Sequence, residues 1–596
     1  MRKGGKEMVK TTRKMRKIVG FLLCLCLLFS CTACARTEYE AYELFPNEYL
    51  MAEDGGVYTP DGSTVQLTET DIQAMNNGNA HMVFGNEGYL SFLNGKYYEG
   101  KITDHEDAVA SIQGVAQLLG LGAGCEFFAQ YGETDDDGYT YYTFHQRYGD
   151  ATVQYATLRV VVDPEGYTAG LSCSFAPNIG IAEQTSAISP EQAVEVVKSK
   201  FPNENLTYYP EATKQVAVTF NYVVYNAYAV YTNNPYMSNS FDMAYYEHFV
   251  SLDGEFIYCL PVATMATENS NPFKADEYFK DFEQLRYTGD ALLYDGSTMP
   301  LDIPIAYNPS DGLYYLCDIQ RKIMVADYGA FCFNGVLSFD TSADGKSWDN
   351  NHLIAYANYI RAYDFYADLG LDSVDDFGTP ILVLVNYCDQ NGVPVNNACH
   401  MGINDGWVCF ASSDGYTYNE ALDVIAHEYT HGVTCYSMGD NVYQNETGAI
   451  NEAYSDIMGN ICEMLTGATT DQTWLVGELS GHIFRSMSSP NLYQQPASRS
   501  DPYYMPPTDN PDDSNDLGGV HINSSLLNSV AYQLWAAGMP LEQEASLWLT
   551  SMELITPRSG YEEVYGALLM SVDINGFAAS YKQLITDAFN NAGLLN

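Results

Sequence analysis

The sequence has few basic residues. Its 596 residues contain 27 Lys and Arg against 76 Asp and Glu, and the formal net charge is −49. Such an acidic chain repels nucleic acid and anionic membrane surfaces, which excludes the functions that depend on binding them by charge. The acidity suits solubility outside a cell, and it says nothing about the fold.

Long apolar runs are also scarce. The apolar segment 18–29 follows a basic stretch and is too short for a comfortable membrane span. This pattern is typical of a secretory signal, so we expect residues 1–35 to be one. Two cleavage patterns remain open: Ala33-Cys34-Ala35 fits a signal peptidase site, and Cys31-Thr32-Ala33-Cys34 resembles a bacterial lipoprotein signal with Cys34 as the lipid anchor. We therefore expect an extracellular protein, secreted or anchored to the outer face of a bacterial membrane.

Cysteine spacings typical of a zinc finger are absent. The chain has 14 cysteines, four of them in the first 34 residues. Export permits disulfides. If the chain is divided near residue 275, three of the other ten cysteines lie before the division and seven after it. Both numbers are odd, so we expect at least one free thiol in each piece, with the connectivity left open.

What the sequence does contain is a metal-binding pattern. His427-Glu428-Tyr429-Thr430-His431 places two histidines four positions apart. Both imidazoles then project from one face of a helix and can reach one ion. Glu452 follows 21 positions after the second histidine. Three protein ligands leave a fourth zinc position open for water, which is typical of a catalytic rather than a structural site.

Both segments of this pattern have helix signals. Asn419 is a candidate N-cap for the first helix, in which apolar residues recur at helical spacing. Thr447 can cap the second helix and Gly467 can end it. On that second helix Glu452 and Asp456 lie at i and i+4, so one can bind the metal while the other orients a ligand histidine.

Together these motifs resemble the thermolysin family of neutral metallopeptidases, over about residues 280–596. The resemblance is carried by His427–His431, Tyr443–Glu452 and Gly518–Asn523. It implies an α+β fold with two catalytic lobes. The first lobe, residues 280–432, is mixed β/α and includes the zinc helix, and the second, residues 433–596, is mostly helical. It also implies a zinc-dependent endopeptidase that acts on peptides and proteins.

The resemblance assigns roles to the motif residues. It implies that His427, His431 and Glu452 hold one catalytic zinc ion and that Glu428 is the general base and acid. Zinc lowers the pKa of a bound water toward about 7. A carboxylate within hydrogen-bond reach can take the proton of that water and later deliver it to the leaving amine.

Further positions match residues that the family uses around the reacting bond. Donors from Tyr443 and His521 would stabilise the oxyanion of the intermediate, and losing one such donor typically costs about 10²–10³ in rate. The remaining matches are Asp456, which would hydrogen-bond a ligand imidazole, Asp516, which would orient His521, and Asn397, Ala398 and Arg485, which would hold the substrate backbone. The family usually has two aromatics after the Asn-Ala pair, where this chain has Cys399 and His400.

Substrate preference follows from the same resemblance. By family position, Val424, Val476 and Phe484 line the pocket just after the scissile bond. Such a pocket favours large apolar side chains on the leaving-group side, and Phe484 would narrow it.

The resemblance also implies a calcium site against the zinc helices. Its carboxylates correspond to Asp423, Glu463 and Glu478, whereas Thr473 and Leu475 stand where the family has further acids. Calcium prefers six to eight oxygen ligands. We therefore expect one calcium ion or a weakened site rather than a full pair, and the alternative is three solvated acids in an acidic protein.

The chain before the catalytic part resembles the propeptide of the same family. Residues 36–100 are acidic, Tyr-rich and interrupted by Gly, and we expect an irregular lead-in. Strand patterns over 101–186 resemble an FTP-like module, and 187–266, with a capped helix at 189–201, resembles a PepSY-like module. This order predicts a latent precursor whose propeptide acts as chaperone and inhibitor until the chain is cut in the polar stretch 267–287.

Two other classes of function remain open. One is a surface lipoprotein that keeps the peptidase fold and binds peptides without turnover, although such a binder has no need of Glu428. The other is a zinc aminopeptidase, which normally recognises a free amine through an upstream acidic motif. The sequence shows no such motif.

Overall fold

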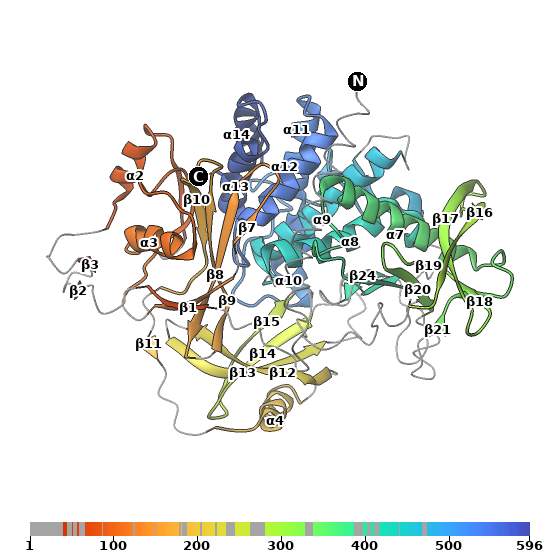
Figure 1. Ribbon diagram of the computed structural model, residues 1–596, viewed down its shortest axis with the longest axis horizontal. Coiled ribbons are helices and arrows are strands. Elements are labelled where there is room, and N and C mark those ends of the chain that lie inside the picture. Colours follow the sequence, from red (N-terminus) through yellow and green to blue (C-terminus); the bar gives the residue numbers. More distant parts are fainter. Residues whose placement is uncertain are drawn as a thin grey trace.

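The fold is given by a computed structural model, in which a strand-rich N-terminal half neighbours the two lobes of the C-terminal half (Figure 1). Segment 1–35, the lipid-anchor candidate Cys34 and most of the predicted cleavage stretch lie outside the described residues. Among the described residues, no helix is both long and apolar enough to cross a membrane. The structure describes residues 40–44, 50–51, 57–58, 66–85, 88–122, 125–130, 132–149, 151–177, 180–181, 187–202, 206–220, 223–233, 245–262, 280–327, 338–386, 397–401, 407–410, 417–439, 442–467 and 474–595.

The N-terminal half is built on a 13-stranded sheet. Tight turns at Gly166 and Gly254, with φ of 90° and 91°, close two of its hairpins. β9 pairs with β12 in parallel at Val153 and Ala217, so one sheet runs through both predicted propeptide modules. In sheet order, the main path contains β1 (Glu40–Glu43), β6 (Glu126–Ala129), β8 (Thr140–Tyr148), β9 (Ala151–Val162), β12 (Thr207–Phe220), β13 (Val223–Asn233), β14 (Tyr245–Ser251) and β15 (Phe256–Val262).

The expectation of an irregular lead-in over 36–100 is wrong for much of its described part. Thr68 forms a capping box with Asp71 and starts a short helix. The two strands that follow it pair with each other, and one of them pairs with β10 (Thr168–Cys173). Elements of four to seven residues carry too little periodicity to be recognised in the sequence. They are α2 (Glu69–Met75), β4 (His81–Phe84) and β5 (Leu90–Asn94), and α3 (His105–Val115) comes next.

Helix α4 (Pro190–Lys200) begins as the sequence predicts. Ser189 and Gln192 form its capping box, and Pro190 stands in the first turn. Its buried residues pack against β13 and β14 in a small core that includes Val230 and Val250. This core is separate from the one beneath α3.

The β-rich lobe contains two sheets (green in Figure 1). Every residue of β23 (Ile381–Val385) is buried, as expected for a parallel strand covered on both faces. The helix α7 (Asn350–Leu369) contacts β23. One sheet contains β16 (Glu283–Leu292), β17 (Thr298–Asn308), β18 (Leu313–Tyr315) and β22 (Thr341–Ser342); the other contains β19 (Cys317–Asp318), β20 (Ile323–Asp327), β21 (Ser338–Phe339), β23, β24 (Ala398–Met401) and β25 (Trp407–Phe410).

The helical lobe surrounds α9, which is buried along most of its length. The predicted lobe boundary at 432/433 falls inside α8, so this helix belongs to both lobes, and it also contacts β24. The helices are α8 (Leu422–Met438), α9 (Asn445–Thr466), α10 (Asp516–Asn523), α11 (Ser525–Ala536), α12 (Leu541–Leu554), α13 (Tyr561–Ile574) and α14 (Ser580–Asn591).

The helix ends differ in part from expectation. Asn419 does not cap α8, because it lies in the 3-10 turn η1 (Tyr418–Glu420) and its amide donates to the carbonyl of Asn351 at 3.1 Å. Thr447 does not cap α9 either, because that helix already begins at Asn445 and Thr447 lies in its first turn. Gly467 ends α9 in a left-handed conformation with φ of 71°, which confirms that prediction.

Free thiols occur on both sides of residue 275, as the odd cysteine counts predict. Cys125 and Cys173 lie before this position and Cys317 and Cys462 after it, all without a disulfide. Burial raises the pKa of Cys125 and that of Cys173 to about 12, so these thiols are unreactive at neutral pH.

The N-terminal sheet and the helical lobe share one hydrophobic core. Val83, Phe92 and Val161 belong to the same buried cluster as the residues of α8, α9 and α13. Strands β4 and β5 contact α13 directly. The backbone of Gly170 lies so close to Met570 and Leu93 that any larger side chain would overlap them. The two parts are therefore packed like the inside of one domain.

Candidate active site and metal centre

Three potential metal ligands converge from two adjacent helices. The Nε2 atoms of His427 and His431, one turn apart on α8, are 3.1 Å from each other. Oε2 of Glu452 on α9 is 3.5 Å from Nε2 of His427, and its Oε1 is 3.5 Å from Nε2 of His431. All three side chains are buried. The group is one of two clusters of metal-ligand type among the described residues.

The geometry of this cluster fits zinc. Atoms that lie about 2.0–2.2 Å from a tetrahedral zinc ion are roughly 3.3–3.6 Å from one another. The observed separations of 3.1 to 3.5 Å are close to this range. Two imidazoles and one carboxylate are also the donor set of many catalytic zinc sites. The three residues are thus arranged to hold one ion.

Asp456 fixes the orientation of the first imidazole. Its Oδ1 lies 2.9 Å from Nδ1 of His427, so that nitrogen carries the proton and Nε2 presents its lone pair to the cluster. Arg485 donates to the same oxygen at 2.8 Å, and Asn528 donates to Oδ2 at 2.7 Å. Although burial raises the pKa of Asp456, Arg485 and His427 together hold it below the ordinary value, so the carboxylate stays ionised.

His431 has its own partner. Its Nδ1 lies 2.6 Å from Oδ1 of Asn451 and 3.1 Å from the hydroxyl of Ser455. Sequence reasoning missed both Asn451 and Asn528. Asn451 precedes Glu452 directly, and that adjacency is the only local signal, whereas Asn528 comes from α11, which only the tertiary fold brings to the site.

Glu428 shares a cavity with the cluster. This cavity has a volume of about 40 Å³ and is lined by residues of both lobes. The side chain of Glu428 is 3 % exposed. The lining residues are Asn397, Ala398, Tyr418, Val424, His427, Glu428, Glu452, Val476, Phe484, Arg485 and His521. The cavity therefore contains the predicted substrate contacts at β24 as well as the predicted base.

Tyr443 and His521 both lie close to Glu452. The hydroxyl of Tyr443 donates a short hydrogen bond to Oε1 of Glu452 and is 3.4 Å from Nε2 of His521. Asp516 accepts from Nδ1 of His521 at 2.5 Å and from its backbone N–H at 2.9 Å. The backbone between them turns through Gly518 and Gly519, each with φ of 86°, which a residue with a side chain rarely adopts.

The predicted calcium carboxylates also meet. Oxygens of Asp423, Glu463 and Glu478 lie within 4.8 Å of one another, whereas Leu475 offers no ligand and Thr473 lies outside the described residues. Burial, and then repulsion by the neighbouring carboxylates, raises the pKa of Asp423 and that of Glu463. Two buried acids and a half-buried one, with oxygens this close together, are the donor chemistry that a hard divalent cation prefers.

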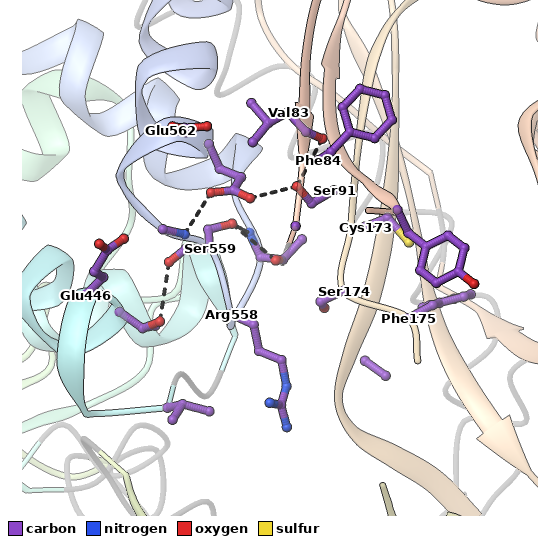
Figure 2. Close-up of a pocket in the computed structure, with 18 of the residues that line it drawn as sticks. Val83, Phe84, Ser91, Cys173, Ser174, Phe175, Glu446, Arg558, Ser559 and Glu562 are labelled. Atoms are coloured by element: carbon purple, nitrogen blue, oxygen red, sulfur yellow. Dashed lines mark hydrogen bonds between the residues drawn. The ribbon is translucent and has the colours of Figure 1, made fainter. Parts of the chain in front are cut away.

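A larger cavity, of about 960 Å³, lies between the N-terminal sheet and the helical lobe (Figure 2). Ser91 on β5 and Glu563 both line this cavity, and the hydroxyl of Ser91 donates to Glu563 at 2.7 Å. Figure 2 shows Glu446, Arg558 and Glu562 on the helical side, facing Cys173 and Phe175 on the sheet. None of the metal-cluster residues lines it, so this cavity belongs to the interface between the two parts.

A two-lobed α+β fold with this cluster in a cavity lined by both lobes defines a zinc metalloendopeptidase. Residues 294–435 match the family model "Thermolysin metallopeptidase, catalytic domain", and residues 440–594 match "Thermolysin metallopeptidase, alpha-helical domain". The chain belongs to the thermolysin family. The zinc cofactor and the capacity for calcium follow from that membership.

Three relatives illustrate the similarity. The thermostable neutral protease NprT of Geobacillus stearothermophilus is 28 % identical over 512 residues, covering 78 % of this chain and 84 % of that protein. Thermolysin of Alicyclobacillus acidocaldarius is 26 % identical over 503 residues, covering 78 % and 85 %. Neutral protease NprE of Bacillus pumilus is 29 % identical over 328 residues, covering 52 % of this chain and 99 % of its own length.

Proposed function

We propose that Glu428 is the general base and acid of peptide-bond hydrolysis, with His427, His431 and Glu452 as the zinc ligands. When bound, zinc supplies a Lewis acid that activates water and polarises the scissile carbonyl. Glu428 takes a proton from the attacking water and then delivers it to the leaving amine. Its place in the cavity beside His427 and Glu452 supports this role, because a general base must lie within hydrogen-bond reach of the proton that it takes.

Tyr443 and His521 stabilise the developing oxyanion in this proposal. The ring of His521 is held by Asp516, so its Nε2 stays directed toward the cluster, and that nitrogen is 3.8 Å from Glu452. A donor that is already oriented needs no rearrangement when charge develops. Asn397 and Ala398, at the edge strand β24, offer backbone groups for an extended substrate, and Arg485 lines the same cavity.

The observation that carries the proposal is the convergence of three ligand side chains, with ligand atoms 3.1 to 3.5 Å apart, beside Glu428. The test is cleavage of an internally quenched peptide with both ends blocked, by the processed wild type and by Glu428→Gln. Removal of a positioned general base costs about 10²–10⁴ in rate, and the variant should keep its zinc. Equal rates for both proteins would contradict the proposal.

The same assay separates the two alternative functions. A zinc aminopeptidase would leave the end-blocked peptide intact and cleave only substrates with a free amino terminus. A binding protein would retain the peptide without turnover in the wild type and in Glu428→Gln alike. Cleavage that chelator abolishes and added zinc restores supports the endopeptidase.

We also propose that the protein is made as a latent precursor. The backbone N–H of Tyr443 donates to the carbonyl of Pro261 on β15 at 3.0 Å. Tyr246 on β14 packs against the cluster of Tyr443, Leu517 and Val520. The N-terminal half thus contacts a proposed oxyanion donor directly, which restricts access to the site until that half leaves.

The similarity to relatives supports this second proposal. The match with NprT covers 78 % of the chain, so it must extend upstream of the catalytic domains. Strand β15 ends at Val262, and the predicted cut in 267–287 follows it. In the test, a precursor with an uncleavable linker is compared with the processed enzyme. We expect at least about tenfold lower kcat/KM for the precursor, and undiminished activity of the intact chain would refute latency.

Two further assignments complete the proposed function. Asp423, Glu463 and Glu478 hold one calcium ion, because their carboxylate oxygens lie within 4.8 Å of one another and Asp423 and Glu463 are buried. The basic and apolar pattern of residues 1–35 directs export, and Cys34 is the candidate lipid anchor. The intact mass of the exported protein tests the second assignment, since it shows both where the chain is cut and whether Cys34 carries lipid.

A further inference from the structure

The apolar part of the cavity beside the metal cluster is narrow. The whole cavity measures about 40 Å³, whereas pockets that bury a small molecule measure about 300–1,000 Å³. One water-sized group occupies about 10–15 Å³ of such a volume, so roughly three fit. The apolar wall consists of Tyr418, Val424, Val476 and Phe484.

Two aromatic rings occupy the space that a substrate side chain would need. Tyr418 and Phe484 stack with ring centroids 5.5 Å apart and planes inclined by 29°. They come from separate segments, Tyr418 from η1 just before α8 and Phe484 from the residue before β27 (Arg485–Ser486). Centroid distances between 4.5 and 7 Å are those of a favourable aromatic pair, so the two rings form one packed unit in the wall of the cavity.

Phe484 is half-buried and packs against residues of its own segment. Its ring lies directly on the backbone of Gly477, where any side chain would overlap it. His482 packs edge-on against the other part of the ring, at a centroid distance of 4.8 Å. The Gly477 segment is itself tied to α8, because its backbone N–H donates to Asp423. Opening the pocket would therefore require moving a segment that is anchored to the metal-binding helix.

We propose that the substrate residue directly after the scissile bond is small, such as Gly, Ala or Ser, and that Tyr418 and Phe484 determine this preference. The inference rests on the proposed endopeptidase function. It replaces the sequence-based expectation of large apolar side chains in this pocket. A leucine or phenylalanine side chain exceeds the available volume unless Tyr418 or Phe484 moves.

The test uses internally quenched peptides that differ only at the residue after the scissile bond. For the processed wild type, kcat/KM should be at least about tenfold higher with Ala than with Leu or Phe, since one methylene group in such a pocket changes the rate about 10–200-fold. The double variant Tyr418→Leu/Phe484→Leu should reverse the order. A wild type that prefers Leu or Phe would overturn the inference.

A matched control replaces another aromatic pair. Tyr307 and Tyr314 pack with centroids 5.0 Å apart on β17 and β18, away from the cavity. Tyr307→Leu/Tyr314→Leu should keep the wild-type order of substrates. If the double variant of the pocket does not fold, the single variant Phe484→Leu should still narrow the Ala-to-Leu ratio at least about threefold.

A binding measurement separates this inference from the proposed function. The same peptides are titrated into Glu428→Gln, which does not need to turn them over. Tighter binding of the Ala peptide than of the Leu peptide supports the narrow pocket, and the reverse order or equal affinity overturns it. Failure of the proposed function has a different signature, because the wild type and Glu428→Gln would then be equally inactive on every peptide.

Discussion

At the residue scale, Asp456 joins three parts of the helical lobe at one carboxylate. His427 reaches it from α8, Arg485 from β27 and Asn528 from α11. A carboxylate with three donors cannot rotate freely, so the imidazole that it holds keeps its lone pair directed at the metal position. The sequence could predict Asp456 from its i+4 spacing to Glu452. It could not predict Asn528, which lies 72 positions further along the chain.

Replacing Asn528 should therefore weaken the metal site without removing a ligand. For Asn528→Leu we expect zinc affinity to fall about 10–100-fold, as typical for a partner of a ligand histidine. Competition with a zinc chelator measures this. Asn591→Leu on α14 is the control. Asn591 is exposed, and within the described part of the chain its side chain hydrogen-bonds only to Gln533. Unchanged zinc affinity in Asn528→Leu would show that the third donor is dispensable.

At the element scale, the carboxylate cluster joins α8, α9 and the turn η2 (Glu478–Ser480). The two helices that carry the metal cluster follow well from the sequence, since α8 and α9 form where the motif and its helix signals predict them. Their starts do not, because Asn419 and Thr447 use their side chains in contacts with other segments. A local capping rule cannot anticipate such tertiary partners.

The cluster predicts how stability depends on pH and calcium. Burial raises the pKa of Asp423 and that of Glu463, so the metal-free fold is most stable when both are protonated. The stabilisation that these two groups contribute should be complete below a pH of about 4, which is their ordinary pKa in the unfolded chain. It should be lost as the pH rises from there through their raised pKa values in the folded protein. Calcium replaces the protons, so the rise in Tm that it produces should grow with pH.

Calorimetry with chelator and with calcium, from pH 5 to pH 8, measures this effect. Glu463→Gln removes one of the charges and should reduce the calcium-dependent rise in Tm. A calcium effect that is the same at both ends of the range would contradict the assignment of these carboxylates.

At the scale of the whole molecule, the N-terminal half is docked by apolar packing and by polar contacts, among them those of the half-buried Arg159. Arg159 on β9 donates to the carbonyl of Ser437 near the end of α8, at 3.2 Å. It also interacts electrostatically with Glu553 on α12. The sequence could predict the strands on both sides of this region. It could not predict that these strands form one sheet or that residues of this sheet share a buried core with α13. Both features depend on contacts between distant segments of the chain.

Glu553 should make this docking sensitive to pH. Burial raises its pKa to about 7, Arg159 opposes that rise, and Glu133, Asp135 and Asp376 add to it. A raised pKa in the docked state favours the protonated carboxyl, so its contribution is complete below about 4.5 and is lost as pH rises through about 7. After the linker is cut, the N-terminal half should therefore dissociate more readily at pH 8 than at pH 5.5.

Size-exclusion chromatography of the cut protein at both pH values measures this dissociation. Glu553→Gln, which cannot ionise, should reduce the difference between them. Tighter association at pH 8 than at pH 5.5 would show that Glu553 is not the controlling group.

The central claim is that His427, His431 and Glu452 hold one catalytic zinc ion, and anomalous diffraction at the zinc absorption edge tests it most directly. Crystals of the zinc-loaded protein should give one strong peak at about 2.0–2.2 Å from Nε2 of both histidines and from a carboxylate oxygen of Glu452. A peak elsewhere in the molecule, or none at this cluster, would contradict the account.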